Sequence, residues 1–131
     1  MSTFRIASGR TAPGQGWQPY MNEGSYLYVD TRSAKFQGNP TYVASLSSTG
    51  GSQLWAAGVS SIYDATKDGF VVYLRWIDDA KRNGEVLTPD VARRFGFYVN
   101  WIGMDSDDPG TSSGGSGGSD GTSSDSLTSR S

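Results

Sequence analysis

Cysteine and histidine are both absent from the 131 residues of the chain. Their absence excludes disulfide scaffolds, zinc sites with Cys or His ligands, cysteine nucleophiles and every catalytic triad that uses a histidine base. Chemistry that uses carboxylates alone is not excluded, so a glycosidase-type pair of acid and base or a metal site with oxygen ligands is still possible. Because most common enzyme mechanisms are removed, the composition favours binding or structural work. We expect no enzymatic activity, no metal and no cofactor.

Long apolar runs and clusters of like charge are also lacking. No apolar run approaches the roughly 18 residues of a membrane span, so we expect none. The opening Met-Ser-Thr-Phe-Arg lacks the apolar stretch of a secretory signal, which fits a cytoplasmic protein or export without a classical signal peptide. The chain has 11 basic and 13 acidic side chains. Because its Lys and Arg residues are not clustered, we expect no nucleic-acid partner.

The composition changes near the C-terminus. Residues 105–131 hold ten Ser, six Gly, five Asp and one large apolar residue, Leu127. Such a segment cannot bury a core, so it predicts a disordered Gly/Ser/Asp-rich tail after a single domain of residues 1–104. The domain carries ten basic and eight acidic groups, a balance of +2, and the tail one and five, a balance of −4. We expect the domain to keep its stability when the tail is removed.

Apolar and polar residues alternate with a period of two along most of the domain, which is typical of strands with one buried face. The clearest case is residues 70–77, where the apolar residues from Phe70 to Trp76 share one face. Six strands without a long helix predict an all-β fold, a six-stranded antiparallel β-sandwich. The expected strands are residues 4–8, 25–31, 41–47, 54–63, 70–77 and 95–104.

One segment breaks this alternation, between residues 78 and 94. Thr88 is a typical N-cap, Pro89 suits a first helical turn and Asp90 complements the helix dipole. We therefore expect a short helical insertion of one or two turns before the last strand.

Acidic residues lie close together in three places, which are Asp64 with Asp68, Asp78 with Asp79, and Asp105 with Asp107 and Asp108. All three adjoin turns, where Asp is common, so solvated turn residues are the favoured interpretation. The last group also lacks the later bidentate Glu of a calcium loop.

The four Trp residues divide into two groups. Trp76 and Trp101 share strand faces with apolar residues, which favours core positions. Trp17 follows a Gly-rich loop and Trp55 begins a strand, so both are less tied to the core.

Five groups of residues, taken in chain order, resemble the H-type lectin domain, the family of snail agglutinins and of the C-terminal discoidin domain. They span most of residues 4–104. The resemblance implies a β-sandwich that assembles as a trimer and binds galactose or N-acetylgalactosamine in clefts between neighbouring subunits. The groups are Arg5-Ile-Ala-Ser-Gly9 with Trp17, Pro40-Thr-Tyr-Val-Ala-Ser-Leu46, Ser61-Ile-Tyr63 with Thr66 and Gly69-Phe70, Tyr73-Leu-Arg-Trp76, and Tyr98-Val-Asn-Trp-Ile102.

The family's sugar contacts are matched less well than its strands. The family commonly has a His after the Trp of the fifth strand, but Ile77 follows Trp76 here. A family Arg on the preceding strand has no counterpart in residues 54–63, and the acidic residue after the first strand is matched only by Glu23. The insertion from Asp79 to Arg94 is another departure. The resemblance thus implies the fold more strongly than the sugar.

These observations predict a noncatalytic carbohydrate-binding domain, lectin-like and multivalent through homo-oligomerisation, with glycans or glycoconjugates as partners. The alternative is a structural or self-assembly module without sugar binding, in which the backs of Tyr-rich strands, including Tyr26, Tyr28 and Tyr73, pack against copies. The residues expected to line the sugar site are Asn22, Glu23, Trp76, Asp78 and Asp79.

Overall fold

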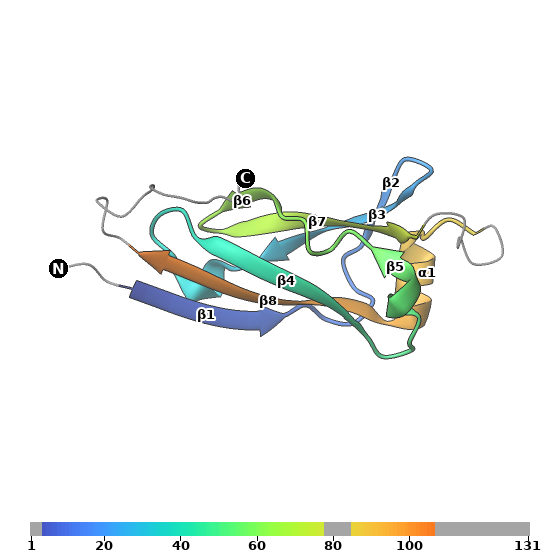
Figure 1. Ribbon diagram of the computed structural model, residues 1–131, viewed down its shortest axis with the longest axis horizontal. Coiled ribbons are helices and arrows are strands. Elements are labelled where there is room, and N and C mark those ends of the chain that lie inside the picture. The colour runs from blue at the N-terminus through green and yellow to red at the C-terminus, as the bar shows by residue number, and fades with distance from the viewer. Residues whose placement is uncertain (1–3, 78–84, 107–131) are drawn as a thin grey trace.

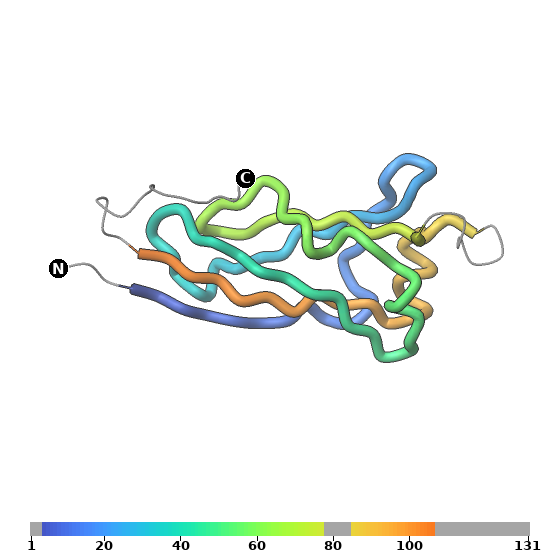
Figure 2. Tube along the Cα trace, in the orientation of Figure 1, coloured from blue at the N-terminus to red at the C-terminus, as the bar shows by residue number. Residues whose placement is uncertain are grey.

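The computed structural model describes residues 4–77 and 85–106. Two antiparallel sheets are stacked as layers, which Figures 1 and 2 show from the same side. The three-stranded sheet has the order β1 (Phe4–Arg10), β8 (Phe97–Ser106) and β4 (Thr41–Ser48). The five-stranded sheet has the order β2 (Gln18–Tyr20), β3 (Gly24–Asp30), β7 (Gly69–Trp76) and β5 (Ala56–Ala57), and β6 (Tyr63–Thr66) also pairs with β7. The expected all-β antiparallel sandwich is confirmed.

The described residues form eight strands rather than the expected six. One difference is β2, which lies between the expected strands at residues 4–8 and 25–31. The other is the expected strand over residues 54–63, which is interrupted. It divides into a 3-10 turn, η2 (Gln53–Trp55), the two-residue β5 and, after a loop, β6. Gly58 in that loop has φ +119°, a conformation that a strand does not contain.

The strand alternation places the core between the sheets as expected. Most inward positions of β3, β4, β7 and β8 are buried, and Trp76 and Trp101 are among them. Trp17, which the sequence tied less closely to the core, is also a core residue, because it is only 5% exposed. Its indole Nε1 donates to the carbonyl oxygen of Phe97 at 3.1 Å, so the polar edge of the buried ring is satisfied.

The expected short helix is α1 (Pro89–Phe95), at the right-hand end of the sandwich in Figure 1. Thr88 is its N-cap, since the Thr88 hydroxyl accepts from the Val91 amide at 3.3 Å. Gly96 ends the helix in the left-handed region at φ +65°, which glycine adopts without steric cost. The last strand therefore starts at Phe97, two residues later than expected.

The domain extends two residues beyond its expected end, because β8 continues to Ser106. Asp105 is 4% exposed. Its carboxylate Oδ2 accepts from the Gln37 amide at 2.6 Å and from the Gly38 amide at 3.1 Å. Asp105 is thus part of the domain, and interpreting it as a solvated turn residue was wrong. Residues 107–131 lie outside the described residues, so their expected disorder stays a prediction.

Replacing Asp105 by Ala leaves the backbone amides of Gln37 and Gly38 without the carboxylate that accepts from them. We expect Asp105→Ala to lower the free energy of unfolding of the full chain by about 1.5–3 kcal/mol, as for other hydrogen bonds to charged groups. Urea denaturation measures the change. Asp68→Ala removes an exposed carboxylate and should cost less than about 0.5 kcal/mol. Equal losses in the two variants would contradict the structural role of Asp105.

Candidate functional site

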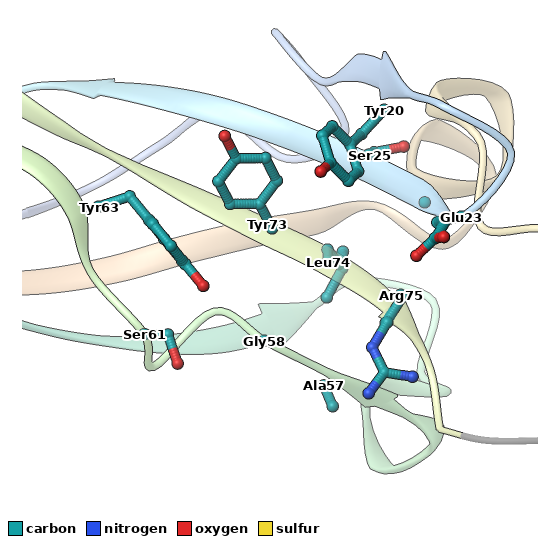
Figure 3. A pocket seen from close by; sticks show the side chains of 11 residues that line it. Tyr20, Glu23, Ser25, Ala57, Gly58, Ser61, Tyr63, Tyr73, Leu74 and Arg75 are labelled. Carbon is teal, nitrogen blue, oxygen red and sulfur yellow. The ribbon is translucent and has the colours of Figure 1, made fainter.

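A cleft of about 420 Å³ opens on the outer face of the five-stranded sheet. Figure 3 shows the side chains that line it, which come from β2, the β2–β3 turn, the start of β3, β7 and residues 57–63. We call it the tyrosine cleft, after its three rings. Its principal residues are Tyr20, Tyr63, Tyr73, Glu23 and Arg75.

Tyr73 stands at the centre of the cleft because of the pleat of β7. Since Val72 and Leu74 point into the core, the residues between and beside them point outward. Tyr20 and Tyr63 each meet the Tyr73 ring edge-on, with centroids 4.9 Å apart in both pairs and interplanar angles of 70° and 82°. Such pairs contribute about 0.5–1.5 kcal/mol each beyond burial. The three rings therefore hold one another in place before any ligand arrives.

Small residues keep the space beside Tyr73 open. Ala57 pairs with Arg75 at the edge of the sheet, and the chain then passes close to β7 at Gly58. A Cβ atom at Gly58 would collide with the carbonyl oxygen of Tyr73. The turn is closed by the Ser61 amide, which donates to the Gly58 carbonyl at 3.0 Å.

One carboxylate and one guanidinium flank the rings at the same end of the cleft (Figure 3). Glu23 is exposed in the β2–β3 turn, where its amide donates to the Tyr20 carbonyl at 3.1 Å. Arg75 donates from one terminal nitrogen to the Trp76 carbonyl at 3.5 Å. Within the described residues neither side chain forms an ion pair, so both keep hydrogen-bonding capacity for a ligand.

The structure brings one of the five predicted site residues into the cleft. Glu23 lines it, and Asn22 is exposed beside Glu23 in the same turn without lining it. Asp78 and Asp79 lie outside the described residues.

Trp76 was also predicted to line the sugar site, and its position contradicts that prediction. It points to the face of β7 opposite Tyr73, is 3% exposed and packs edge-on against Phe95 and Phe97 at 6.0 and 6.1 Å. A core ring of this kind offers no surface to a sugar.

Four of the five principal residues of the cleft were not among the predicted site residues: Tyr20, Tyr63, Tyr73 and Arg75. The alternation of β7 did indicate that Tyr73 and Arg75 face outward. Nothing in the local sequence indicates that Tyr20 and Tyr63, from segments more than 40 residues apart in the chain, lie on either side of Tyr73.

The chemistry available in the cleft is ring contact and hydrogen bonding. Among its described lining residues Glu23 is the single carboxylate, so they supply no acid and base pair for glycoside hydrolysis. Across residues 4–77 and 85–106, no three acidic side chains gather to hold a metal ion. The same ranges contain no helix with the length and hydrophobicity to span a bilayer.

Alanine variants of Gly58 and Gly51 test whether the loop at Gly58 must approach β7 so closely. Both have positive φ, +119° and +84°, but a Cβ at Gly51 meets nothing within 4 Å. We expect Gly51→Ala to cost about 1 kcal/mol of strain, and Gly58→Ala at least about 1 kcal/mol more because it also displaces Tyr73. Urea denaturation of both variants checks this. If they lose the same stability, the close approach is not required.

Comparisons of this chain with protein-family models, with curated proteins and with solved structures find no match. The resemblance to H-type lectins therefore stays a prediction.

Proposed function

We propose that the protein is a noncatalytic carbohydrate-binding domain whose binding site is the tyrosine cleft. The observation that carries this proposal is the set of three mutually packed tyrosine rings with a carboxylate and a guanidinium at one end. A sugar ring has apolar C–H surfaces and a rim of hydroxyl groups. Tyrosine rings match the first, and Glu23, Arg75 and the phenolic hydroxyls match the second.

We also propose a class of sugar and the joining of several sites in one assembly. The resemblance to H-type lectins favours galactose or N-acetylgalactosamine. The cleft differs from that family's site in being lined by one chain, with Glu23 accepting from hydroxyl groups and Arg75 donating to them. A single open site of this kind binds weakly, and joining several in one assembly raises the avidity by about two to four orders of magnitude.

A glycan array on the full chain, followed by calorimetric titration of the selected sugar, tests the site. We expect Tyr73→Ala to lower affinity about tenfold or more by removing the central ring. Glu23→Gln, in an exposed turn, should lower it several-fold by weakening hydrogen bonds to sugar hydroxyls. Tyr98→Ala, on the outer face of the other sheet, is the matched control and should bind normally. An array without binding, or unchanged affinity in both cleft variants, would overturn the proposal.

A second candidate function, assembly with further copies, is favoured by the outer face of the three-stranded sheet. Five apolar residues on it are 39–62% exposed: Phe4, Ile6, Val43, Ile102 and Met104. The strand register makes them contiguous, because Ile6 is opposite Met104 and Val43 is opposite Ile102. We call this surface the apolar face. Contiguous exposed apolar patches of more than a few hundred Å² are typical of interaction sites.

We propose a second copy of the chain as the occupant of the apolar face. Of the side chains that point outward from β1, β8 and β4, Arg10 is the single charged one, so an identical face meets little repulsion. The residues that follow Ser106 in the sequence include one large apolar residue, Leu127, which is too little to cover the apolar face. Sheet faces pack about 10 Å apart, so two apolar faces would form a core between copies.

Light scattering on the full chain tests assembly. We expect a mass that is a multiple of the 14.0 kDa chain, and we expect Ile102→Lys to reduce it to one chain because a buried unpaired charge is costly. Ala65→Lys, exposed on β6, should leave the mass unchanged. A monomeric wild-type chain at all concentrations would contradict the proposal.

A further inference from the structure

Two further tyrosines continue the aromatic surface beyond the cleft. Tyr26 of β3 is opposite Tyr73 in the register, with ring centroids 5.9 Å apart. Tyr28, two residues further along β3, is opposite Val71, and Tyr63 is opposite the same valine on its other side. Tyr28 is 51% exposed. Five of the seven tyrosines thus lie on one sheet face, and we call them the tyrosine stripe: Tyr20, Tyr26, Tyr28, Tyr63 and Tyr73.

The stripe is longer than a single sugar ring. It runs along β7 from Arg75, past Tyr73, to Val71. These four residue steps of about 3.3 Å each span about 13 Å. A single pyranose ring covers the cleft end only, whereas a chain of about three linked sugar units reaches from Arg75 to Tyr28.

The ring at the far end is held in position. The Tyr28 hydroxyl donates to the Asp68 carbonyl at 3.1 Å. The tip of the Tyr28 ring lies over Gly69, where a Cβ atom would collide with it. A ring fixed in this way loses little conformational entropy when a ligand stacks on it.

The two ends of the stripe differ in charge. At the far end the charges near Tyr28 are paired, since Arg32 bonds to Asp30 at 2.8 Å and Lys67 lies 3.4 Å from Asp68. The hydrogen bonds from Arg32 also lower the pKa of the Asp30 carboxyl. At the cleft end Glu23 and Arg75 are not ion-paired with any described residue, and their charges balance. The stripe therefore suits a neutral ligand that is hydrogen-bonded at one end and stacked along its length.

Building on the carbohydrate-binding function proposed above, we infer that the ligand is a neutral oligosaccharide chain of about three units rather than a single terminal sugar. Its end unit lies against the Tyr73 ring between Glu23 and Arg75, and the following units stack on Tyr26 and Tyr28.

Titration of the full chain with galactose and with β-1,4-linked galacto-oligosaccharides of two to six units tests chain length. We expect the association constant to rise about tenfold or more between one and three units and then to level off, because contacts end at Tyr28. Equal affinity for one and four units would overturn the extended site and leave the carbohydrate-binding function standing. If no member of the series binds, the inference falls, and the glycan array decides separately on the function.

Variants at the two ends locate the chain. We expect Tyr28→Ala to lower affinity about five- to tenfold for three or more units and less than about twofold for galactose. Tyr73→Ala should lower it for every length, and Tyr98→Ala for none. Tyr28→Phe keeps the ring without its hydroxyl bond, so retained affinity in this variant shows that stacking is what matters. An equal loss at all lengths in Tyr28→Ala would overturn the inference. So would binding of a proline-rich peptide to the stripe while no oligosaccharide binds.

Discussion

The alternation of side chains along β7 is the constraint on which both the core and the site depend. This strand pairs with β3, β5 and β6, so it fixes the position of everything in its sheet. Its inward residues, from Phe70 to Trp76, are almost completely buried. A shift of one residue would exchange the two faces, and it would bury Tyr73 and Arg75 while exposing the core. The hydrophobic free energy that stabilises the sandwich thus also orients the cleft.

The cleft is completed by segments with no strong pattern of their own. The end of β2 supplies Tyr20, the β2–β3 turn supplies Glu23, and the loop at Gly58 leads to Tyr63. They are held against β7 by ring contacts and by the close backbone approach at Gly58. A site built in this way is ordered by the sheet beneath it, and the exposed polar groups at its rim remain available for a ligand.

The two proposed functions use opposite faces of the sandwich. The tyrosine stripe lies on the outer face of the five-stranded sheet and the apolar face on the outer face of the three-stranded sheet, as the layers in Figure 1 show. Assembly through the apolar face would therefore leave every tyrosine cleft open. That separation supports multivalent binding, because several weak sites in one assembly act together on a ligand with many sugars.

The sequence by itself determined the features that depend on neighbours along the chain. The period of two identified the inward residues of β3, β4, β7 and β8, and Thr88 indicated where α1 begins. Only the tertiary structure decided contacts between distant residues. The buried Trp17 donates a hydrogen bond to a residue 80 positions away. The buried Asp105 accepts hydrogen bonds from amides up to 68 positions away. Trp76 was predicted both for the core and for the site. The local pattern gives the face on which a side chain lies but not which segments cover that face, because that depends on how the sheets pack.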